Sequence, residues 1–470
     1  MRERNTHCDG SLAPVSEHTC YVLSAAMRWM QRINAARPML SDTLIVAAGN
    51  VVVKGAGLLK LIITAHLFGT SDAQDAFLAA FLLPSSLGDI FAASATPALV
   101  PAMVRLQPGE HDREADELYR SAFASSVAAM CAIAGLLALA APAVFAIIAS
   151  GFSGEKTQLA TTLFYWLLPL LPLAGCNVVW RAVLNAHRRF ALAAVAPAVT
   201  PLTTLAVLAG GASRWGIYAL AFGVVAGGMA EAALLAAAVR RLGYGVCPLW
   251  RGRGEGLRDV LPQFAPLLGG SLLLGSCPLI DNAMAAGLES GSVSVLNFGT
   301  RLTTVLASIG PAAVGTAALP HLADMAARGE WRKMRGDLRW FGSLIVAAVI
   351  PVAAVLIALT EPLVRIAFQK GAFSEASTLA VAAVQRYSLL QIPFAVLSAL
   401  GFRLAASLRA NELFLPVAAV GFCVTVTADY LLRQALGVPG IALAATLSQI
   451  AMISTLAVLL ARRLRKGRAA

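Results

Sequence analysis

Long apolar runs separated by short polar stretches dominate this chain from Asp42 onward. A run of about 20 apolar residues crosses the hydrocarbon core of a bilayer as one helix. The pattern therefore predicts an all-α polytopic membrane protein with about 12 transmembrane helices. The predicted spans are residues 42–69, 75–104, 119–149, 158–180, 190–211, 215–239, 260–287, 292–320, 340–360, 376–402, 413–432 and 438–461.

Lysine and arginine are distributed unevenly between the two sides that these spans define. Alternate loops carry groups of basic residues, and the loops between them carry few. Because cytoplasmic loops are enriched in Lys and Arg, the asymmetry predicts that both termini are cytoplasmic. The net charge of +12 is spread over every cytoplasmic loop, which suits contact with anionic lipid and indicates no nucleic-acid partner. The basic residues of the predicted outer loops are Lys156, Arg214, Arg365, Lys370 and Arg433.

The longest cytoplasmic linker divides the predicted spans into two sets of six. Paired halves of this kind are typical of transporters whose two lobes rock around a central cavity. We therefore expect two six-helix lobes around such a cavity. The expected order is a cytoplasmic arm (1–41), an N-lobe (42–239), the cytoplasmic linker (240–259), a C-lobe (260–461) and a basic cytoplasmic tail (462–470).

Two lysines, Lys54 and Lys60, lie inside the first predicted span. A lysine at the centre of a lipid-facing helix costs about 2.5–3.5 kcal/mol on insertion scales, so both side chains need a polar environment. We predict that they face a water-filled, cationic cavity that binds an anionic substrate. The alternative is that they pair with buried carboxylates and only hold helices together. Arg301, in the eighth span, joins them if the two lobes face each other.

Carboxylates inside other spans are candidate partners for these cations. Asp89 and Glu231 are predicted to pair with a lysine, to sense protons or to bond to helix backbone, and Asp281 is a candidate counter-ion. Asp429 and Arg386 lie near the outer ends of their spans, where snorkelling or ordinary pairing accounts for them. The GxxxG formed by the glycines at 223 and 227 indicates close helix packing.

Composition supports the membrane class and excludes several others. The chain is 58% hydrophobic and 13% charged, which excludes a soluble globular protein. Its seven cysteines form no CxxC pair, so neither a disulfide framework nor a metal site is indicated. The stretch GAGLLK at 55–60 lies within a span and lacks the GK[ST] ending of a nucleotide-binding loop. We expect no cofactor.

Five segments carry a resemblance to a known transporter family. DAFLAAFLLPSSLGDIFAASATPALVP (75–101) resembles the second helix of the MurJ (MviN) lipid II flippases, and residues 280–330 are similar to that family's seventh and eighth helices. The matches are ordered, and together they extend over roughly residues 42–465. The family belongs to the multidrug/oligosaccharidyl-lipid/polysaccharide (MOP) exporter superfamily. The remaining segments are RAVLNAHRRFALAAVAPAVTP (181–201), QKGAFSEAS (369–377) and LRANELFLPVAA (408–419).

The resemblance implies a function. Such proteins move an undecaprenyl-pyrophosphate-linked saccharide across the bacterial inner membrane without making or breaking a bond, so the chain is expected not to be an enzyme and to have no catalytic residue. A glycan polymerase is the partner that such a flippase would serve. Family arginines in helix 1 align with Lys54 and Lys60, the helix 8 arginine aligns with Arg301, and the aspartate opening helix 2 aligns with Asp75. These four residues are the predicted substrate-binding set.

Departures from the family pattern keep alternatives open. Lysine replaces arginine at both helix 1 positions, which loses the bidentate fork that grips a pyrophosphate. Gly88 and Asp89 replace paired arginines, and Ala93 replaces a glutamate. An exopolysaccharide repeat unit therefore fits as well as lipid II, the peptidoglycan precursor. Two other classes are a multidrug-type small-molecule antiporter, for which acidic cavity residues would be expected, and a membrane glycan polymerase or ligase, for which a large outer loop would be expected.

Overall fold

The structure is a computed structural model that describes residues 45–105, 112–247, 255–307, 325, 331–407 and 411–466. These ranges are helical, with short turns between the helices and no strand within them. The first helix covers Ile45–Phe68, and a second unlabelled helix covers residues 292–307. The others are α2 (Asp72–Arg105), α3 (Asp112–Ile148), α4 (Gly154–Leu167), α5 (Leu170–Ala186), α6 (Phe190–Val195), η1 (Ala196–Ala198), α7 (Val199–Trp215), α8 (Ile217–Arg241), α9 (Glu255–Ala286), α11 (Trp331–Ala358), α12 (Thr360–Phe368), α13 (Glu375–Leu389), α14 (Ile392–Ser407), η2 (Asn411–Leu413), α15 (Phe414–Leu436) and α16 (Val438–Lys466).

The number of membrane-crossing helices agrees with the sequence pattern. Within the described residues, 9 helices are long and apolar enough to cross a membrane, and two bent pairs raise the number to 11. The bent pairs are Gly342–Ala358 with Thr360–Phe368, at 60°, and Glu375–Leu389 with Ile392–Phe402, at 42°. The prediction of an all-α polytopic membrane protein is therefore confirmed. The eighth predicted span is helical over residues 292–307, and the rest of it lies outside the described residues.

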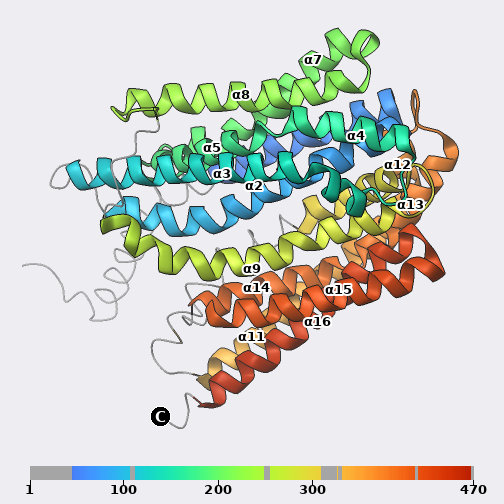
Figure 1. The fold of residues 1–470 in the computed structure, drawn as a ribbon. Helices are drawn as coiled ribbons and strands as arrows, with labels where there is room; N and C mark the ends of the chain where they lie inside the picture. Colours follow the sequence, from blue (N-terminus) through green and yellow to red (C-terminus); the bar gives the residue numbers. More distant parts are fainter. Residues whose placement is uncertain are drawn as a thin grey trace, which may run out of the picture.

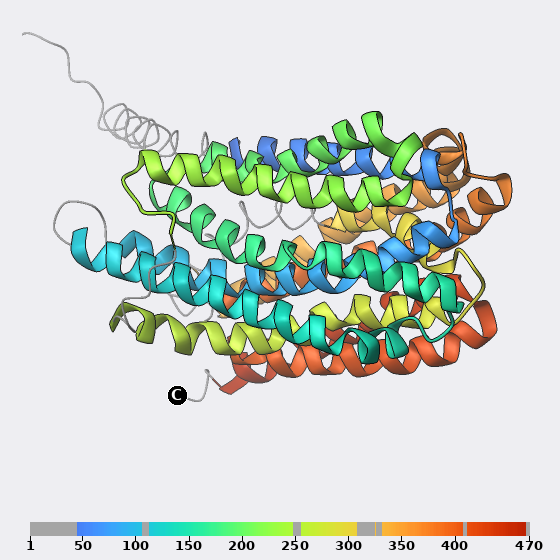
Figure 2. The same cartoon turned by 45° about the horizontal axis from the view of Figure 1, so that its top comes forward.

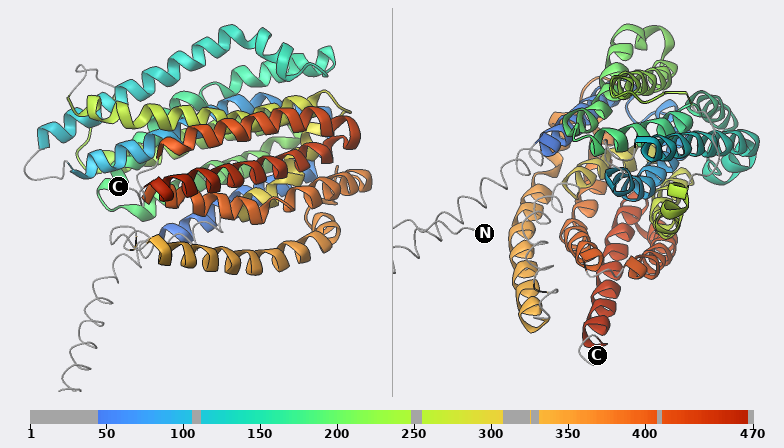
Figure 3. Two further views of the ribbon diagram at one scale, coloured as in Figure 1. Left: turned by 90° about the horizontal axis from the view of Figure 1, so that it is seen from below. Right: turned by 90° about the vertical axis from the view of Figure 1, so that its left-hand side faces the viewer.

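The helices run side by side along one direction and form two groups (Figures 1 and 2). The N-lobe is the first helix with α2 to α8, and one hydrophobic core joins α2, α3, α4, α5, α7 and α8. The C-lobe is α9, residues 292–307 and α11 to α16. Its α11 lies at the edge of the bundle, against α13 and α14 (Figure 3). Helix α9 contacts α2 and α3 as well as α15, so it connects the two lobes.

The first helix passes from one lobe to the other along its length. Near its start, Gly49 packs so closely on Ala194 of α6 that an added Cβ would lie 2.7 Å from the Ala194 Cβ. Near its end, Ala65 belongs to a C-lobe core with Phe298 and Phe373. The cationic segment between these two anchors therefore lies at the boundary between the lobes.

The two lobes also touch through the turns at one end of the bundle. This end carries the turns at 69–71, 149–153, 287–291 and 369–374, and the basic-residue asymmetry predicts that it faces outward, so we call it the outer end. The Ala372 N–H donates to the His66 carbonyl oxygen at 2.9 Å, and the Thr70 and Ser377 hydroxyls are 2.8 Å apart. Each contact joins the N-lobe to the C-lobe.

Candidate functional site

A cavity of about 1050 Å³ lies between the two lobes. Its wall is made by the first helix, α2, α5, α7 and α8 of the N-lobe and by α9, residues 292–307, α14, α15 and α16 of the C-lobe. Apolar side chains make up much of this wall, so the charged groups in it are in a medium where electrostatic forces are stronger than in water. The charged residues lining the cavity are Lys60, Asp89, Arg181, Glu231, Asp281 and Arg301.

The three predicted cations lie close together, and two of them, Lys60 and Arg301, line this cavity. Lys54 and Lys60 on the first helix each interact electrostatically with Arg301, which projects from the opposite lobe. A Cβ atom added to Gly57 would lie 3.7 Å from a terminal amino group of Arg301, so the glycine leaves room for the guanidinium. The Lys60 ammonium lies 5.7 Å from the centre of the Phe81 ring. We call Lys54, Lys60 and Arg301 the cationic wall.

Asp89 is the acid that interacts electrostatically with this wall. It is exposed and interacts electrostatically with Lys54, Arg301 and Arg181. Among the described residues, none of the close ion pairs involves Asp89 or a member of the cationic wall. The cations therefore repel one another, with only partial compensation from a carboxylate that does not contact them. Such an arrangement favours binding of an additional anion.

Arg181 is a cavity residue that the sequence did not reveal. The fourth span was predicted to end at 180, whereas α5 continues to Ala186 and carries Arg181 into the cavity wall. Its position one helical turn after Asn177, another polar residue of the wall, is the signal that could have identified it. Arg181 interacts electrostatically with Glu231 on α8 as well as with Asp89. Both predicted acids of the N-lobe therefore share one arginine.

Asp75 lies away from the cationic wall, at the outer end. Its carboxylate is 1% exposed and accepts hydrogen bonds from the backbone N–H groups of Gly291 and Ser294, both at 2.8 Å. The Ser294 hydroxyl donates to it as well. These donors open the helix at residues 292–307, where a carboxylate is favoured by the free N–H groups and the helix dipole. The structure thus places Asp75 in a contact between the lobes.

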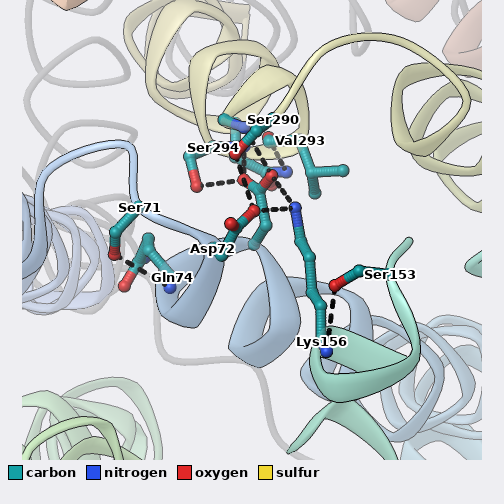
Figure 4. A network of polar contacts seen from close by, with 11 residues as sticks. Ser71, Asp72, Gln74, Ser153, Lys156, Ser290, Val293 and Ser294 are labelled. Atoms are coloured by element: carbon teal, nitrogen blue, oxygen red, sulfur yellow. Dashed lines mark hydrogen bonds and ion pairs between the residues drawn. The ribbon is translucent and has the colours of Figure 1, made fainter. Parts of the chain in front are cut away.

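Lys156 completes this contact. Its ammonium group donates to Asp72 at 2.6 Å and to Asp75 at 2.8 Å, and it lies 4.2 Å from the centre of the Phe152 ring. The Ser290 hydroxyl of the C-lobe donates to Asp72 at 2.6 Å (Figure 4). The sequence pattern places Lys156 in an outer loop, but its side chain is buried at the start of α4. We call Asp72, Asp75, Lys156, Ser290, Gly291 and Ser294 the interlobe latch.

Asp281 on α9 lies beside Asp429 on α15. Asp429 is 0% exposed, and neither of its carboxylate oxygens has a hydrogen-bond partner among the described residues. One carboxylate oxygen of Asp281 is also buried without a hydrogen-bond partner among the described residues. Asp281 lines the same cavity as Lys60 and Arg301, and the residue with which it interacts electrostatically is Asp429. Asp429 is buried and does not snorkel. Within the described part of the chain, no group of 3 or more His, Cys, Asp or Glu side chains is arranged to hold a metal ion.

Solved structures define the class of protein. The fold is similar to that of "Lipid II flippase MurJ, inward closed conformation", with a TM-score of 0.77, 19% sequence identity, and coverage of 89% of this chain and 87% of that chain. It is also similar to an inward-facing multidrug resistance MATE family transporter of the MOP superfamily, with a TM-score of 0.74, 15% identity, and coverage of 90% and 99%. The protein therefore has the multi-pass, two-lobe fold of these transporters.

The family follows from the sequence. A family model described as "Lipid II flippase MurJ" matches residues 64–470, and the chain belongs to this family. A probable lipid II flippase MurJ from Rhizobium meliloti is 26% identical over 404 residues, covering 83% of this chain and 74% of the relative. One from Thermotoga maritima is 27% identical over 422 residues, covering 88% and 83%. Arg301 and Asp75 lie inside the matched region, whereas Lys54 and Lys60 precede it.

Proposed function

We propose that this chain is a flippase that moves an undecaprenyl-pyrophosphate-linked saccharide across the bacterial inner membrane by alternating access. The observation that carries the proposal is the cationic wall, in which Lys60 and Arg301 face the same cavity from opposite lobes, with Lys54 beside them. The relatives are named as lipid II flippases, which are transporters and not enzymes. A lipid-linked diphosphate supplies the compact anion that the cationic wall favours, while its prenyl tail would stay in lipid.

The anion is held by charge. Two unit charges 4 Å apart attract each other by about 4 kcal/mol at an effective dielectric constant of 20. A diphosphate between Lys60 and Arg301 relieves the repulsion between these cations and binds both lobes at once. Lysine offers point charges where arginine would offer a fork, so the first helix grips the diphosphate less rigidly than arginine would.

Release requires the lobes to separate at the outer end. The interlobe latch holds this end together, so we infer that Asp75 acts in the conformational cycle rather than in contact with the substrate. When the latch opens, Arg301 moves with the C-lobe while the outer end of α2 moves with the N-lobe. The cations of the two lobes then no longer surround the anion, and its binding weakens.

A coupling role is proposed for Asp281 together with Asp429. Two carboxylates so close together inside a membrane protein repel each other, and Asp429 also interacts electrostatically with Arg433. One arginine offsets one carboxylate, so a proton or a monovalent cation would accompany the other. Occupancy of the pair then depends on ion gradients. Asp89 takes the role of counter-ion to the cationic wall while the cavity is empty.

The proposed substrate is lipid II or a related exopolysaccharide repeat unit, delivered to a glycan polymerase on the outer side, with both termini of the chain cytoplasmic. The cations at Lys54, Lys60 and Arg301 disfavour a drug antiporter, and the short outer loops disfavour a polymerase or ligase. Expression in a bacterium depleted of its own lipid II flippase tests the proposal. Rescue by the wild type and its loss in Lys60→Ala and Arg301→Ala would support lipid II. No rescue by stably inserted wild type would assign the exopolysaccharide unit instead.

A further inference from the structure

Polar side chains from four N-lobe helices line the same cavity to which the C-lobe contributes Arg301. They are Asp89 on α2, Asn177 and Arg181 on α5, Thr200 on α7 and Glu231 on α8, and all five belong to the cavity wall. We call these residues the N-lobe polar cluster. The function proposed above assigns a role to Asp89 alone among them.

Close helix packing fixes the acidic end of this cluster. A Cβ added to Gly227 of α8 would lie 2.6 Å from the carbonyl oxygen of Thr200, so α7 and α8 touch backbone to backbone. The close packing predicted for the GxxxG is confirmed. At this approach the Thr200 hydroxyl donates to the Glu231 carboxylate at 2.9 Å, and Glu231 is 7% exposed. The acid is therefore held in one position against the cavity.

Other polar groups of the cluster lack protein partners. The amide oxygen of Asn177 is buried and has no hydrogen-bond partner among the described residues, and Asn177 as a whole is 6% exposed. Arg181 donates from Nε to the Asn177 carbonyl oxygen at 3.3 Å, and the described residues provide its terminal amino groups with no further acceptor. Arg181 is half-buried in the cavity wall, so its terminal amino groups are free to donate to a ligand there. The unpaired amide oxygen beside it is a buried polar group of the kind that proteins almost always pair.

The charges of the cluster exclude the diphosphate as that ligand. One arginine lies between two carboxylates, which leaves the cluster with a net charge of about −1 when all three groups are ionised. A phosphate would be repelled here and attracted to the cationic wall. Hydroxyl groups suit the cluster, because carboxylates and an amide oxygen accept from them while a guanidinium donates to their oxygens.

We propose that the N-lobe polar cluster is a saccharide subsite, adjoining the cationic wall at Asp89, that selects uncharged or amine-bearing sugars over anionic ones. This inference rests on the proposed flippase function and specifies the head group of its substrate. The diphosphate lies at Lys60 and Arg301, and the sugar attached to it reaches across the cavity to Arg181 and Glu231.

Binding to the full chain in nanodiscs, measured by native mass spectrometry, tests the subsite. The probes are undecaprenyl pyrophosphate without sugar, the same lipid bearing N-acetylglucosamine, and the same lipid bearing glucuronic acid. Wild type should bind the N-acetylglucosamine lipid about fivefold to tenfold more tightly than the bare lipid, the effect of one or two hydrogen bonds. Arg181→Gln and Glu231→Gln should abolish this preference and leave affinity for the bare lipid unchanged.

Two further variants separate a subsite from a structural role. Glu231→Gln should bind the glucuronic acid lipid several-fold more tightly than wild type, because it removes a repelling charge, whereas Glu289→Gln, an exposed acid outside the cavity wall, should not. Lys60→Ala should weaken all three lipids alike. Equal weakening of bare and sugar-bearing lipids by Arg181→Gln, or an unchanged sugar preference, would overturn the subsite while leaving the flippase intact. Failure of wild type to bind any of these lipids would overturn both proposals.

Discussion

The carboxylate of Asp75 on α2 accepts a hydrogen bond from the backbone N–H of Ser294, 2.8 Å away across the boundary between the lobes. The two residues are 219 positions apart in the chain. The same carboxylate contacts Lys156, which also contacts Asp72, so one buried group joins α2, α4 and the helix at residues 292–307. Closure of the outer end therefore depends on a small number of charged and backbone groups.

Replacement of Asp75 should loosen this end. Asp75→Asn removes one charge from a buried pair, and breaking such a pair costs about 3–5 kcal/mol. Asparagine keeps only one of the two acceptor oxygens, so either the Gly291 or the Ser294 amide loses its acceptor. Hydrogen exchange of that amide should accelerate by at least about tenfold, the effect of 1.4 kcal/mol. Exchange measured by mass spectrometry over residues 288–296 checks this. Asp116→Asn, which breaks an ion pair with Arg120 within one helix, is the control and should leave that exchange unchanged.

A glycine in the latch should be irreplaceable. Gly291 has a φ of 88°, and an added Cβ would lie 2.7 Å from the Thr70 carbonyl oxygen. Gly291→Ala combines backbone strain with a steric clash, each of about 1–3 kcal/mol, so thermal unfolding in detergent should begin at a clearly lower temperature. Gly135→Ala is the matched control, because nothing lies within 4 Å of its added Cβ and α3 is helical there. A Gly291 variant as stable as the control would contradict the packing at this turn.

The sequence predicted those site residues whose unusual character is visible from their immediate sequence neighbours. Lys54, Lys60 and Arg301 stand out because a charge within an apolar run needs an explanation at that position alone. Lys156 gave no such signal, because a lysine between two spans is ordinary and its burial comes from Asp72 and Asp75, more than 80 residues away. The fold was predictable for the same reason as the cations, since span length and alternation are local properties.

Residues near predicted span ends were the least predictable. Arg386 was expected to pair or snorkel near the surface, and it pairs with Glu361 at 3.3 Å. Asp429 was given the same interpretation, yet it is fully buried beside Asp281 on another helix. Arg181 was missed because α5 continues beyond the predicted end of its span. Tertiary packing decides which side of a helix end faces the protein interior, and the sequence of one span does not contain that information.

The cationic wall should depend on charge more than on side-chain shape. Lys60→Arg keeps the charge and should retain flipping of the lipid-linked saccharide, whereas Lys60→Ala should reduce it by at least about tenfold, the loss of one charge-assisted contact of 1.5–3 kcal/mol. Fluorescent lipid translocation in proteoliposomes checks both variants. Lys370→Ala, in an outer turn, is the control and should flip at the wild-type rate. Equal rates in Lys60→Ala and wild type would remove the cationic wall from the mechanism.

The acidic pair should affect energy coupling and not substrate binding. Asp429→Asn leaves Asp281 with a neutral neighbour, so the like-charge conflict disappears and the protein should keep its stability or gain up to about 1 kcal/mol. Flipping in proteoliposomes should then lose its dependence on an imposed proton or sodium gradient, because the site that such a cation would occupy is incomplete. Binding of undecaprenyl pyrophosphate should remain at the wild-type level, since the cationic wall is intact. Gradient dependence equal to that of wild type in both Asp429→Asn and Asp281→Asn would show that the pair is structural.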